Sequence, residues 1–237
     1  GDFDTANLWI TNCILEHADP TEYALSTGGK SGYPRKSVIV SGCEFRGGGI
    51  FVVDSQDVLI DGCFGAIDHV ESIGYSDRVT FRDCRFDIAN ATQGLNLKYS
   101  PSLGTPTNWA LIDCDWTALE AGITILAVWG VDGFTLRGGR YTGAGDGTGT
   151  VGLELHATRS MKDIIVDGPL FDTMRYGVLA YKDDSNTLTN ARMWGRFKDI
   201  IDGAEMSGQH KGRDIFNFRP MCTHWFASNH TPKTSDS

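Results

Sequence analysis

The 237-residue sequence lacks several features that would place it in a familiar class of protein. No stretch approaches the ~20 consecutive apolar residues of a transmembrane helix, and no signal-peptide pattern opens the chain. No Cys-x-x-Cys spacing is present, which argues against a structural zinc site. Basic residues are scarce, at 21 against 30 acidic ones. The net charge of −9 disfavours nucleic acid and membranes as partners and favours a neutral or basic polysaccharide over a polyanionic one.

What the sequence does contain is a repeated pattern. Five of the six cysteines follow an alternating apolar segment by the same offset, namely Cys13, Cys43, Cys63, Cys84 and Cys114. The pattern continues without sulfur at Gly139, Pro169 and Gly195, so that successive markers lie 20 to 30 residues apart. A period of that size indicates a solenoid.

The pattern inside one repeat is that of strands. Apolar residues alternate with a period of two, as in the segment VTF at residues 79–81. A glycine followed by alternating residues predicts a second strand in most repeats, at residues 49–52, 94–97, 122–125, 152–155 and 177–180. The aromatic residue after the marker predicts a third strand. Coils of three short strands that stack ~4.8 Å apart form a parallel β-helix.

The phrases VLIDGCFG, VTFRDCRF and IIVDGPLF, followed by GITI or GLEL, resemble the pectate-lyase-like right-handed parallel β-helix family over residues 7–201. The resemblance implies the fold but no particular activity, because one fold hosts many functions. The catalytic motifs of the better-known pectin enzymes, such as the N-T-D strand, the G-H-G turn and D-P-H-E, are absent.

We expect one all-β domain, a right-handed parallel β-helix of about eight coils over residues 1–218, followed by a C-terminal cap or tail over residues 219–237. The first coil begins close to residue 1 without an amphipathic capping helix. Such a helix normally covers an exposed solenoid end, so this predicts an excised domain whose neighbour covers the first coil.

The cysteine ladder is interpreted as core packing. Disulfides between coils are not excluded by distance, but side chains stacked in register point the same way, which is poor geometry for a bridge. A reduced cysteine is a small hydrophobe that fills a core position of fixed size. Free thiols indicate folding in a reducing cytoplasm, which favours a protein that is assembled there and then acts outside the cell or on a virion surface.

Functional side chains are expected on the outward positions of the strand that follows each glycine, because this strand lines the ligand groove in the family that the chain resembles. The predicted catalytic residues are Glu154, His156, Asp183 and Lys98. The predicted substrate-binding residues are Asn96, Arg159, Tyr181, Trp129 and Glu71. The alternative is that these residues form ordinary solvated surface.

The residue types fit two chemistries. Glu154 and His156 are two apart on a strand and share a face, as a general acid and base would. Glu154 and Asp183 lie on adjacent coils, and two carboxylates ~6.5–9.5 Å apart suit inverting glycoside hydrolysis. For β-elimination of a uronic acid polymer, His156 and Tyr181 offer a base, and Lys98 and Arg159 offer a cation. The sequence does not choose between them.

An apolar set is also predicted to point outward, comprising Phe51, Val53, Leu126, Val128, Trp129, Leu179 and Tyr181. Such a row marks a trimer interface or a sugar-binding groove, unless a slip of one residue in the register returns it to the core. No metal or cofactor is expected. Asp146, in the segment GAGDGTGT, gives only a weak calcium signal, and a flexible turn is the alternative.

These patterns predict a carbohydrate-engaging β-helix. The first interpretation is the polysaccharide depolymerase or receptor-binding domain of a tailspike-type protein, acting by hydrolysis or β-elimination. The alternative is a non-catalytic adhesin or a structural β-helix that forms a homotrimer in a virion or cell-surface protein. The sequence leaves open whether the chain is an enzyme.

Overall fold

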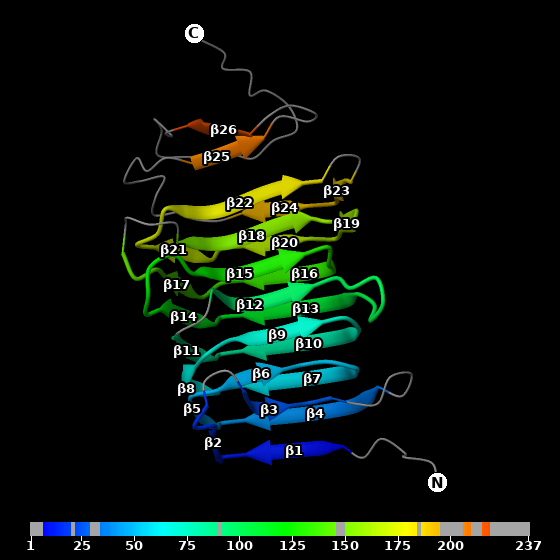
Figure 1. Ribbon diagram of the computed structural model, residues 1–237, viewed down its shortest axis with the longest axis vertical. Helices are drawn as coiled ribbons and strands as arrows, with labels where there is room; N and C mark the ends of the chain where they lie inside the picture. The colour runs from blue at the N-terminus through cyan, green and yellow to red at the C-terminus, as the bar shows by residue number, and fades with distance from the viewer. Residues whose placement is uncertain are drawn as a thin grey trace.

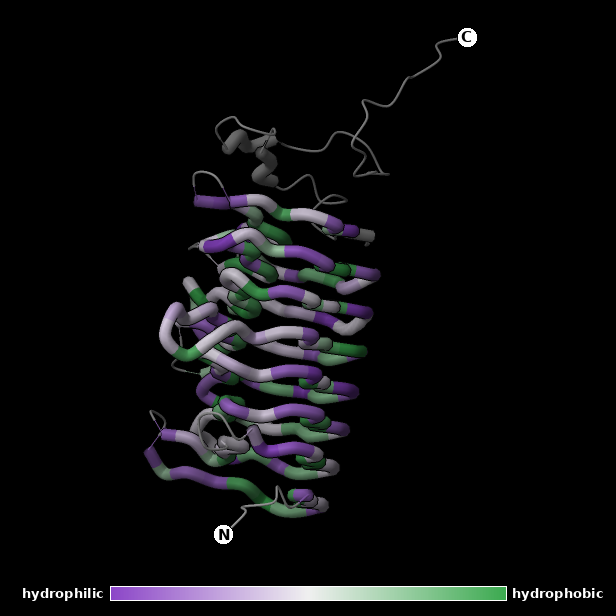
Figure 2. Tube along the Cα trace, turned by 90° about the vertical axis from the view of Figure 1, so that its right-hand side faces the viewer, coloured by the Kyte–Doolittle hydropathy of each residue, from purple (hydrophilic) through white to green (hydrophobic). Residues whose placement is uncertain are grey.

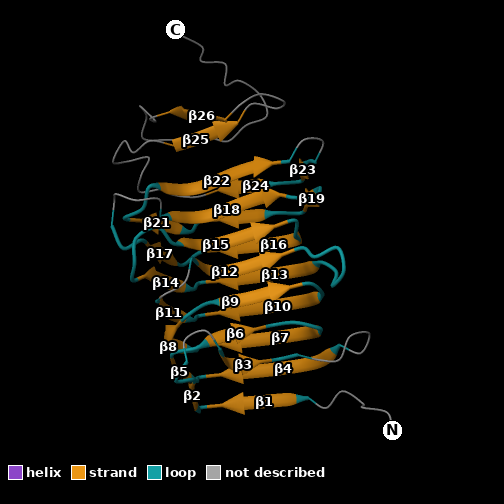
Figure 3. Cartoon of the chain, in the orientation of Figure 1, coloured by secondary structure: helices purple, strands orange, loops and turns teal. Residues whose placement is uncertain are grey.

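The computed structural model describes residues 7–19, 22–28, 34–89, 92–145, 150–183, 186–194, 206–209 and 215–218. Within these residues the chain is a right-handed parallel β-helix (Figure 1). Strands and loops make up the described part (Figure 3), and none of its residues form a helix long and apolar enough to cross a membrane. The predicted fold is confirmed.

Three parallel sheets run along the solenoid, and each coil contributes a strand to each of them in turn. Sheet A consists of β1 (Leu8–Thr11), β4 (Arg35–Ser41), β7 (Ser55–Asp61), β10 (Ser76–Arg82), β13 (Pro106–Ile112), β16 (Asp132–Arg137), β20 (Ile165–Asp167) and β24 (Arg192–Trp194). Sheet B consists of β2 (Ile14–Glu16), β5 (Glu44–Arg46), β8 (Phe64–Ile67), β11 (Arg85–Ile88), β14 (Asp115–Ala118), β17 (Arg140–Thr142) and β21 (Leu170–Asp172).

Sheet C consists of β3 (Tyr23–Ser26), β6 (Gly49–Phe51), β9 (Val70–Ile73), β12 (Gln93–Lys98), β15 (Thr124–Trp129), β18 (Val151–Ala157) and β22 (Tyr176–Lys182). It contains the strands predicted from the glycine signal. Two small sheets pair β19 (Met161–Lys162) with β23 (Leu188–Thr189) and β25 (Met206–Gln209) with β26 (Ile215–Phe218). The predicted tail, residues 219–237, lies outside the described residues, so the domain boundary stays a prediction.

Each coil bends from sheet A to sheet B at a residue with left-handed backbone geometry. This residue directly precedes the repeat marker, and its φ lies between 51° and 70° in seven coils, at Asn12, Gly42, Gly62, Asp83, Asp113, Gly138 and Gly168. Glycine adopts this region freely, and Asn and Asp tolerate it better than other residues. The marker pattern in the sequence therefore reflects a bend that these seven coils share.

The core is formed by side chains that point inward from all three sheets. Figure 2 shows hydrophobic and hydrophilic segments alternating along the stacked coils. The largest fully buried side chains are Trp109, Trp116, Tyr141, Phe45, Phe81, Phe86, Phe134 and Phe171. Their rings contact one another from coil to coil, as between Phe86 and Trp116, which pack edge to face with centroids 5.7 Å apart. Burial of such large rings is the main stabilising contribution to a fold of this kind.

The cysteine ladder lies in this core as predicted. Cys43, Cys63, Cys84 and Cys114 are fully buried and unbridged, and Cys13, also unbridged, is exposed in the first described coil. A hydrogen bond with Cys114, followed by burial, raises the pKa of Cys84 to about 12. The Cys84 thiol thus stays protonated and acts as a small apolar side chain.

The prediction that Leu126 and Val128 point outward is wrong, because both are fully buried. The parallel register pairs Leu126 with Leu95, so Gly94 aligns with Ile125 and not with Gly122. The sequence prediction therefore aligned this strand three residues too early, at Gly122 instead of Ile125. An odd shift along a strand exchanges its two faces.

Candidate functional site

The outward face of sheet C carries two rows of side chains in register. The first row runs through β9, β12, β15, β18 and β22 as Glu71, Asn96, Ala127, Glu154 and Leu179. The second row lies two residues further along the same strands, as Ile73, Lys98, Trp129, His156 and Tyr181. Seven of the nine predicted site residues lie in these rows. Asp183 follows directly after β22, and Arg159 lies after β18.

Glu154 is the most enclosed charged residue of this face, with 8% of its surface exposed. Its Oε1 atom accepts hydrogen bonds from Trp129 Nε1 at 2.9 Å and from the Tyr181 hydroxyl at 2.5 Å, and its Oε2 accepts from Thr124 Oγ1 at 3.4 Å. Burial, followed by the hydrogen bond to Glu154, raises the pKa of Tyr181. The tyrosine therefore remains a donor at neutral pH. Glu154 fixes the positions of both rings, and its predicted role as a catalytic acid stays a prediction.

His156 and Asp183 form a second pair beside this carboxylate. His156 Nε2 lies 2.8 Å from Asp183 Oδ1, and the imidazole packs against the Tyr181 ring at 4.1 Å and against Trp129 at 5.7 Å between centroids. The Asp183 carboxylate orients the imidazole, which leaves the other ring nitrogen for a proton transfer. We refer to Glu154, His156, Tyr181 and Asp183 as the Glu154 cluster.

Lys98 lies next to this cluster, and its Nζ is 5.3 Å from the centre of the Trp129 ring. Among the described residues, no carboxylate lies within 4.0 Å of its ammonium group. Arg159 is placed elsewhere: its guanidinium donates to the Gly130 carbonyl at 2.8 Å and to Asp132 Oδ2 at 2.6 Å. It braces the turn between β15 and β16. Its predicted role in substrate binding stays a prediction that this geometry does not support.

Glu71 is the centre of a second group of side chains. The hydroxyl of Tyr23 donates to Glu71 Oε2, and Asn96 Nδ2 donates to Glu71 Oε1 at 3.2 Å. His69 Nδ1 lies 2.6 Å from Asp68 Oδ2, and its Nε2 is 3.9 Å from Glu71 Oε2. We refer to Tyr23, Asp68, His69 and Glu71 as the Glu71 cluster. Burial, then the hydrogen bond to Glu71, raises the pKa of Tyr23.

Sequence reasoning missed Tyr23, Asp68 and His69. Tyr23 begins β3, 48 residues before Glu71, and no local sequence pattern connects the two residues. One signal was present: the segment His69-Val70-Glu71 reverses the order of Glu154-Leu155-His156, so both pairs share a strand face.

The outward charged side chains of sheets A and B form arginine–carboxylate pairs, unlike those of sheet C. Asp61 accepts two hydrogen bonds from Arg82 on the next coil, at 2.7 and 3.0 Å, and this arginine lowers the pKa of the Asp61 carboxyl. Arg137 and Asp167 face each other in the same way at 3.5 Å. Such pairs are ordinary solvated surface. On sheet C, hydroxyl, indole and amide donors hold the Glu71 and Glu154 carboxylates instead, which sets this face apart.

Two loops border sheet C at opposite ends of its strands. The loop of residues 99–105 follows β12, and the described residues 143–145 and Thr150 precede β18. The backbone of the first loop is tied down, because the Leu103 carbonyl accepts from Tyr75 N at 2.9 Å. The candidate calcium ligand Asp146 lies outside the described residues. Within the described ranges, no three His, Cys, Asp or Glu side chains are grouped to hold a metal ion.

Comparisons with protein-family models, with curated proteins and with solved structures found no match. The pectate-lyase-like family therefore stays a resemblance, and the functional argument rests on the geometry of sheet C.

Proposed function

We propose that the chain is a carbohydrate-engaging β-helix that binds a polysaccharide on the outward face of sheet C, as the depolymerase or receptor-binding domain of a tailspike-type protein. The observation that supports this most is the row of Lys98, Trp129, His156 and Tyr181 on four consecutive strands. Flat rings beside hydrogen-bonding groups suit sugars, whose rings have an apolar face and polar edges.

Cleavage in this proposal depends on His156. Asp183 orients the imidazole, and Trp129 and Tyr181 flank it. Protonated, the imidazole donates a proton to the leaving glycosidic oxygen; neutral, it removes one from an attacking water or from a sugar ring carbon. Glu154 then acts by holding the rings in place through its three hydrogen bonds.

The test is incubation with a panel of capsular, O-antigen, plant and algal polysaccharides. New reducing ends without absorbance near 232 nm indicate hydrolysis, and both signals together indicate β-elimination. We expect His156→Ala to abolish the product and Asp183→Asn to reduce it by about 10²-fold or more, as loss of an orienting general-base partner does. Arg137→Ala, on sheet A, is the matched control and should act like the wild type.

A non-catalytic adhesin is the second candidate, and one observation favours it. Both oxygens of Glu154 accept hydrogen bonds from protein side chains, which fits a carboxylate that positions Trp129 and Tyr181 better than one that exchanges a proton with a substrate. Polysaccharide that is retained by the protein but yields no product from any substrate would support this candidate and refute the enzyme.

A trimer packed through sheet C has less support, because two residues of its predicted apolar row, Leu126 and Val128, are buried. Light scattering tests the trimer, which requires a mass about three times the chain mass of 25.9 kDa. An extracellular or virion-surface location after folding in a reducing cytoplasm remains part of the proposal, as does function without a metal, a membrane or nucleic acid.

A further inference from the structure

The two clusters on sheet C have the same composition. In each, a tyrosine hydroxyl donates to a glutamate, from Tyr23 to Glu71 and from Tyr181 to Glu154. In each, a histidine lies two residues from that glutamate and pairs with an aspartate. Burial raises the pKa of both tyrosines, so both hydroxyls keep their protons. The same four side-chain types therefore occur twice on one face.

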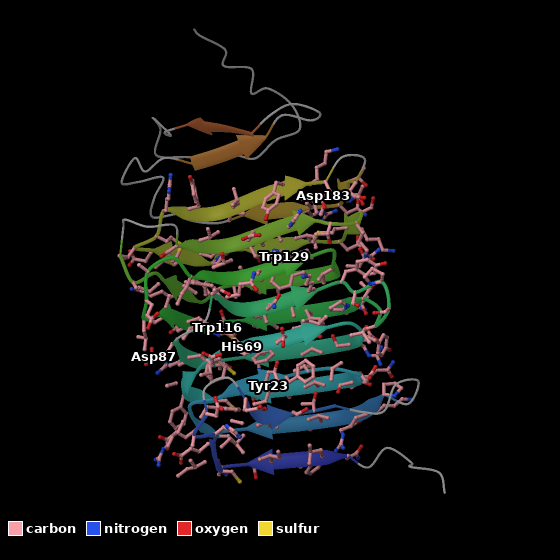
Figure 4. All side chains as sticks on the ribbon, in the orientation of Figure 1. Tyr23, His69, Asp87, Trp116, Trp129 and Asp183 are labelled. Atoms are coloured by element: carbon pink, nitrogen blue, oxygen red, sulfur yellow. The ribbon has the colours of Figure 1, made fainter. Side chains whose placement is uncertain are left out.

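Both clusters lie on the outward face of sheet C, on either side of β12 and β15. Glu71 and Glu154 lie in the same register row, three strands apart, and each tyrosine lies on the far side of its glutamate. His69 precedes its glutamate by two residues, whereas His156 follows its glutamate by two. With ~4.8 Å between strands and ~3.3 Å per residue, the two histidines are about 20 Å apart along a diagonal. In Figure 4 the labels of His69, Trp129 and Asp183 rise obliquely across this face, and Tyr23 lies below His69.

The middle of this diagonal lies on β12 and β15. Ala127, the residue between the glutamates on β15, has no side chain beyond Cβ and is fully buried beneath its neighbours on this face. The neighbouring Asn96 Oδ1 is buried without a hydrogen-bond partner among the described residues, although its Nδ2 is engaged with Glu71. A buried acceptor without a donor is costly, and a ligand hydroxyl would satisfy it. Trp129 and Lys98 border the same position.

The charge of the face indicates the class of ligand. The two clusters contain four carboxylates, from Asp68, Glu71, Glu154 and Asp183, and Lys98 is the one lysine or arginine in the two rows. A polymer with a carboxylate, sulfate or phosphate on each unit would be repelled at close range. A polymer that carries hydroxyl and amide groups avoids this repulsion, and one of its donors could pair with Asn96 Oδ1.

We propose that the Glu71 and Glu154 clusters are the two ends of one extended site. The site takes a segment longer than a disaccharide from a polysaccharide without acidic groups, laid obliquely across sheet C. This inference rests on the proposed function, because it assumes a glycan ligand. It also selects hydrolysis over β-elimination, since elimination requires a uronic acid unit.

The test measures retention of the full chain in native gels that contain dextran, mannan or galactan, against gels that contain polygalacturonate or alginate. Oligosaccharides from the best-retained polymer then give affinity and stoichiometry by calorimetry. We expect retention by an uncharged polymer and one oligosaccharide per chain. His69→Ala and His156→Ala should each weaken binding about tenfold, a loss on the scale of one hydrogen bond.

Arg137→Ala is the control here as well, because Arg137 lies on β16 of sheet A, away from both clusters, and it should bind like the wild type. Tyr23→Phe is a milder second variant of the Glu71 cluster, in case His69→Ala fails to fold. If wild-type retention is unchanged in every folded Glu71-cluster variant, the extended site is refuted while the proposed function stands. Two oligosaccharides per chain, or strongest retention by a uronate polymer, also refutes this inference alone. No retention of the wild type by any polymer refutes the proposed function itself.

Discussion

Replacing Tyr141 by phenylalanine should stabilise the protein, although most core substitutions destabilise. The Tyr141 side chain is fully buried in the row of sheet B that contains Trp116 and Phe171. Its hydroxyl has no hydrogen-bond partner among the described residues, and burial raises its pKa well above the usual value. Phenylalanine fits the equivalent position at Phe86 and Phe171, so the slot accepts the ring without the oxygen.

The expected gain follows from two opposing contributions. A buried hydroxyl without a partner costs ~1–3 kcal/mol relative to its hydrated state in the unfolded chain. Removing the oxygen also removes a few dispersion contacts, each worth ~0.1–0.2 kcal/mol. The free energy of unfolding should therefore rise by about 1 kcal/mol in Tyr141→Phe. For a chain of this length that corresponds to roughly 2–4 °C in Tm.

The assay is urea denaturation at pH 7, followed by far-UV circular dichroism, with thermal melting alongside. Tyr181→Phe is the matched comparison, because it makes the same chemical change where the hydroxyl donates to the buried Glu154 carboxylate. A hydrogen bond to a charged group contributes ~1.5–3 kcal/mol, so this variant should lose stability. The reasoning fails if Tyr141→Phe is destabilised by 1 kcal/mol or more, since the hydroxyl must then have a partner in solution.

Three further predictions concern the backbone and the cysteine ladder. Gly139→Ala should be strongly destabilised, because φ at Gly139 is +76° and the new Cβ would lie 2.1 Å from a backbone oxygen. Gly168 has a similar φ of +70° but no atom within 4 Å of the added Cβ, so Gly168→Ala should lower the free energy of unfolding by only ~1–2 kcal/mol. Equal urea midpoints for the two variants would contradict this prediction. In a Cys222→Ser background, a thiol reagent should label Cys13 rapidly and the buried thiols only on unfolding, and more than one fast thiol in the native protein would be inconsistent with the core assignment. The pKa of Cys84 is raised above its unfolded value of ~8.5 to about 12, so its contribution to stability is complete below pH 8.5 and is lost as the pH rises toward 12. The urea midpoint should therefore fall between about pH 8.5 and 12, and it should fall less steeply in Cys84→Ala. An equal slope in both proteins would count against a buried, protonated Cys84 thiol.

Much of the fold follows from the sequence, because a β-helix repeats one local geometry. In seven coils the residue before the marker has a left-handed φ, and the apolar residues before it point into the core, so the same pattern recurs along the sequence. The error at Leu126 and Val128 has a local cause. Gly122 resembles Gly94, the second residue of β12, but the position in β15 that aligns with Gly94 is Ile125.

The site was less accessible to sequence reasoning. The pattern placed Asn96, Glu154 and His156 on one face, and the register confirms that placement. It did not show that Trp129 and Tyr181 both donate to Glu154, because these contacts depend on how side chains from three coils meet. The Glu71 cluster escaped for the same reason, since its tyrosine lies 48 residues away.

The parallel stacking of sheet C has a consequence for how such a chain can change. Every coil adds one ~4.8 Å step to each sheet, so the separation of two features on one face is set by the number of coils between them. β12 and β15 separate the strands of Glu71 and Glu154. Gain or loss of a single coil would lengthen or shorten the span by one step and leave each cluster intact. In such a solenoid, duplication or deletion of a whole repeat changes the distance between two binding groups in steps of one coil.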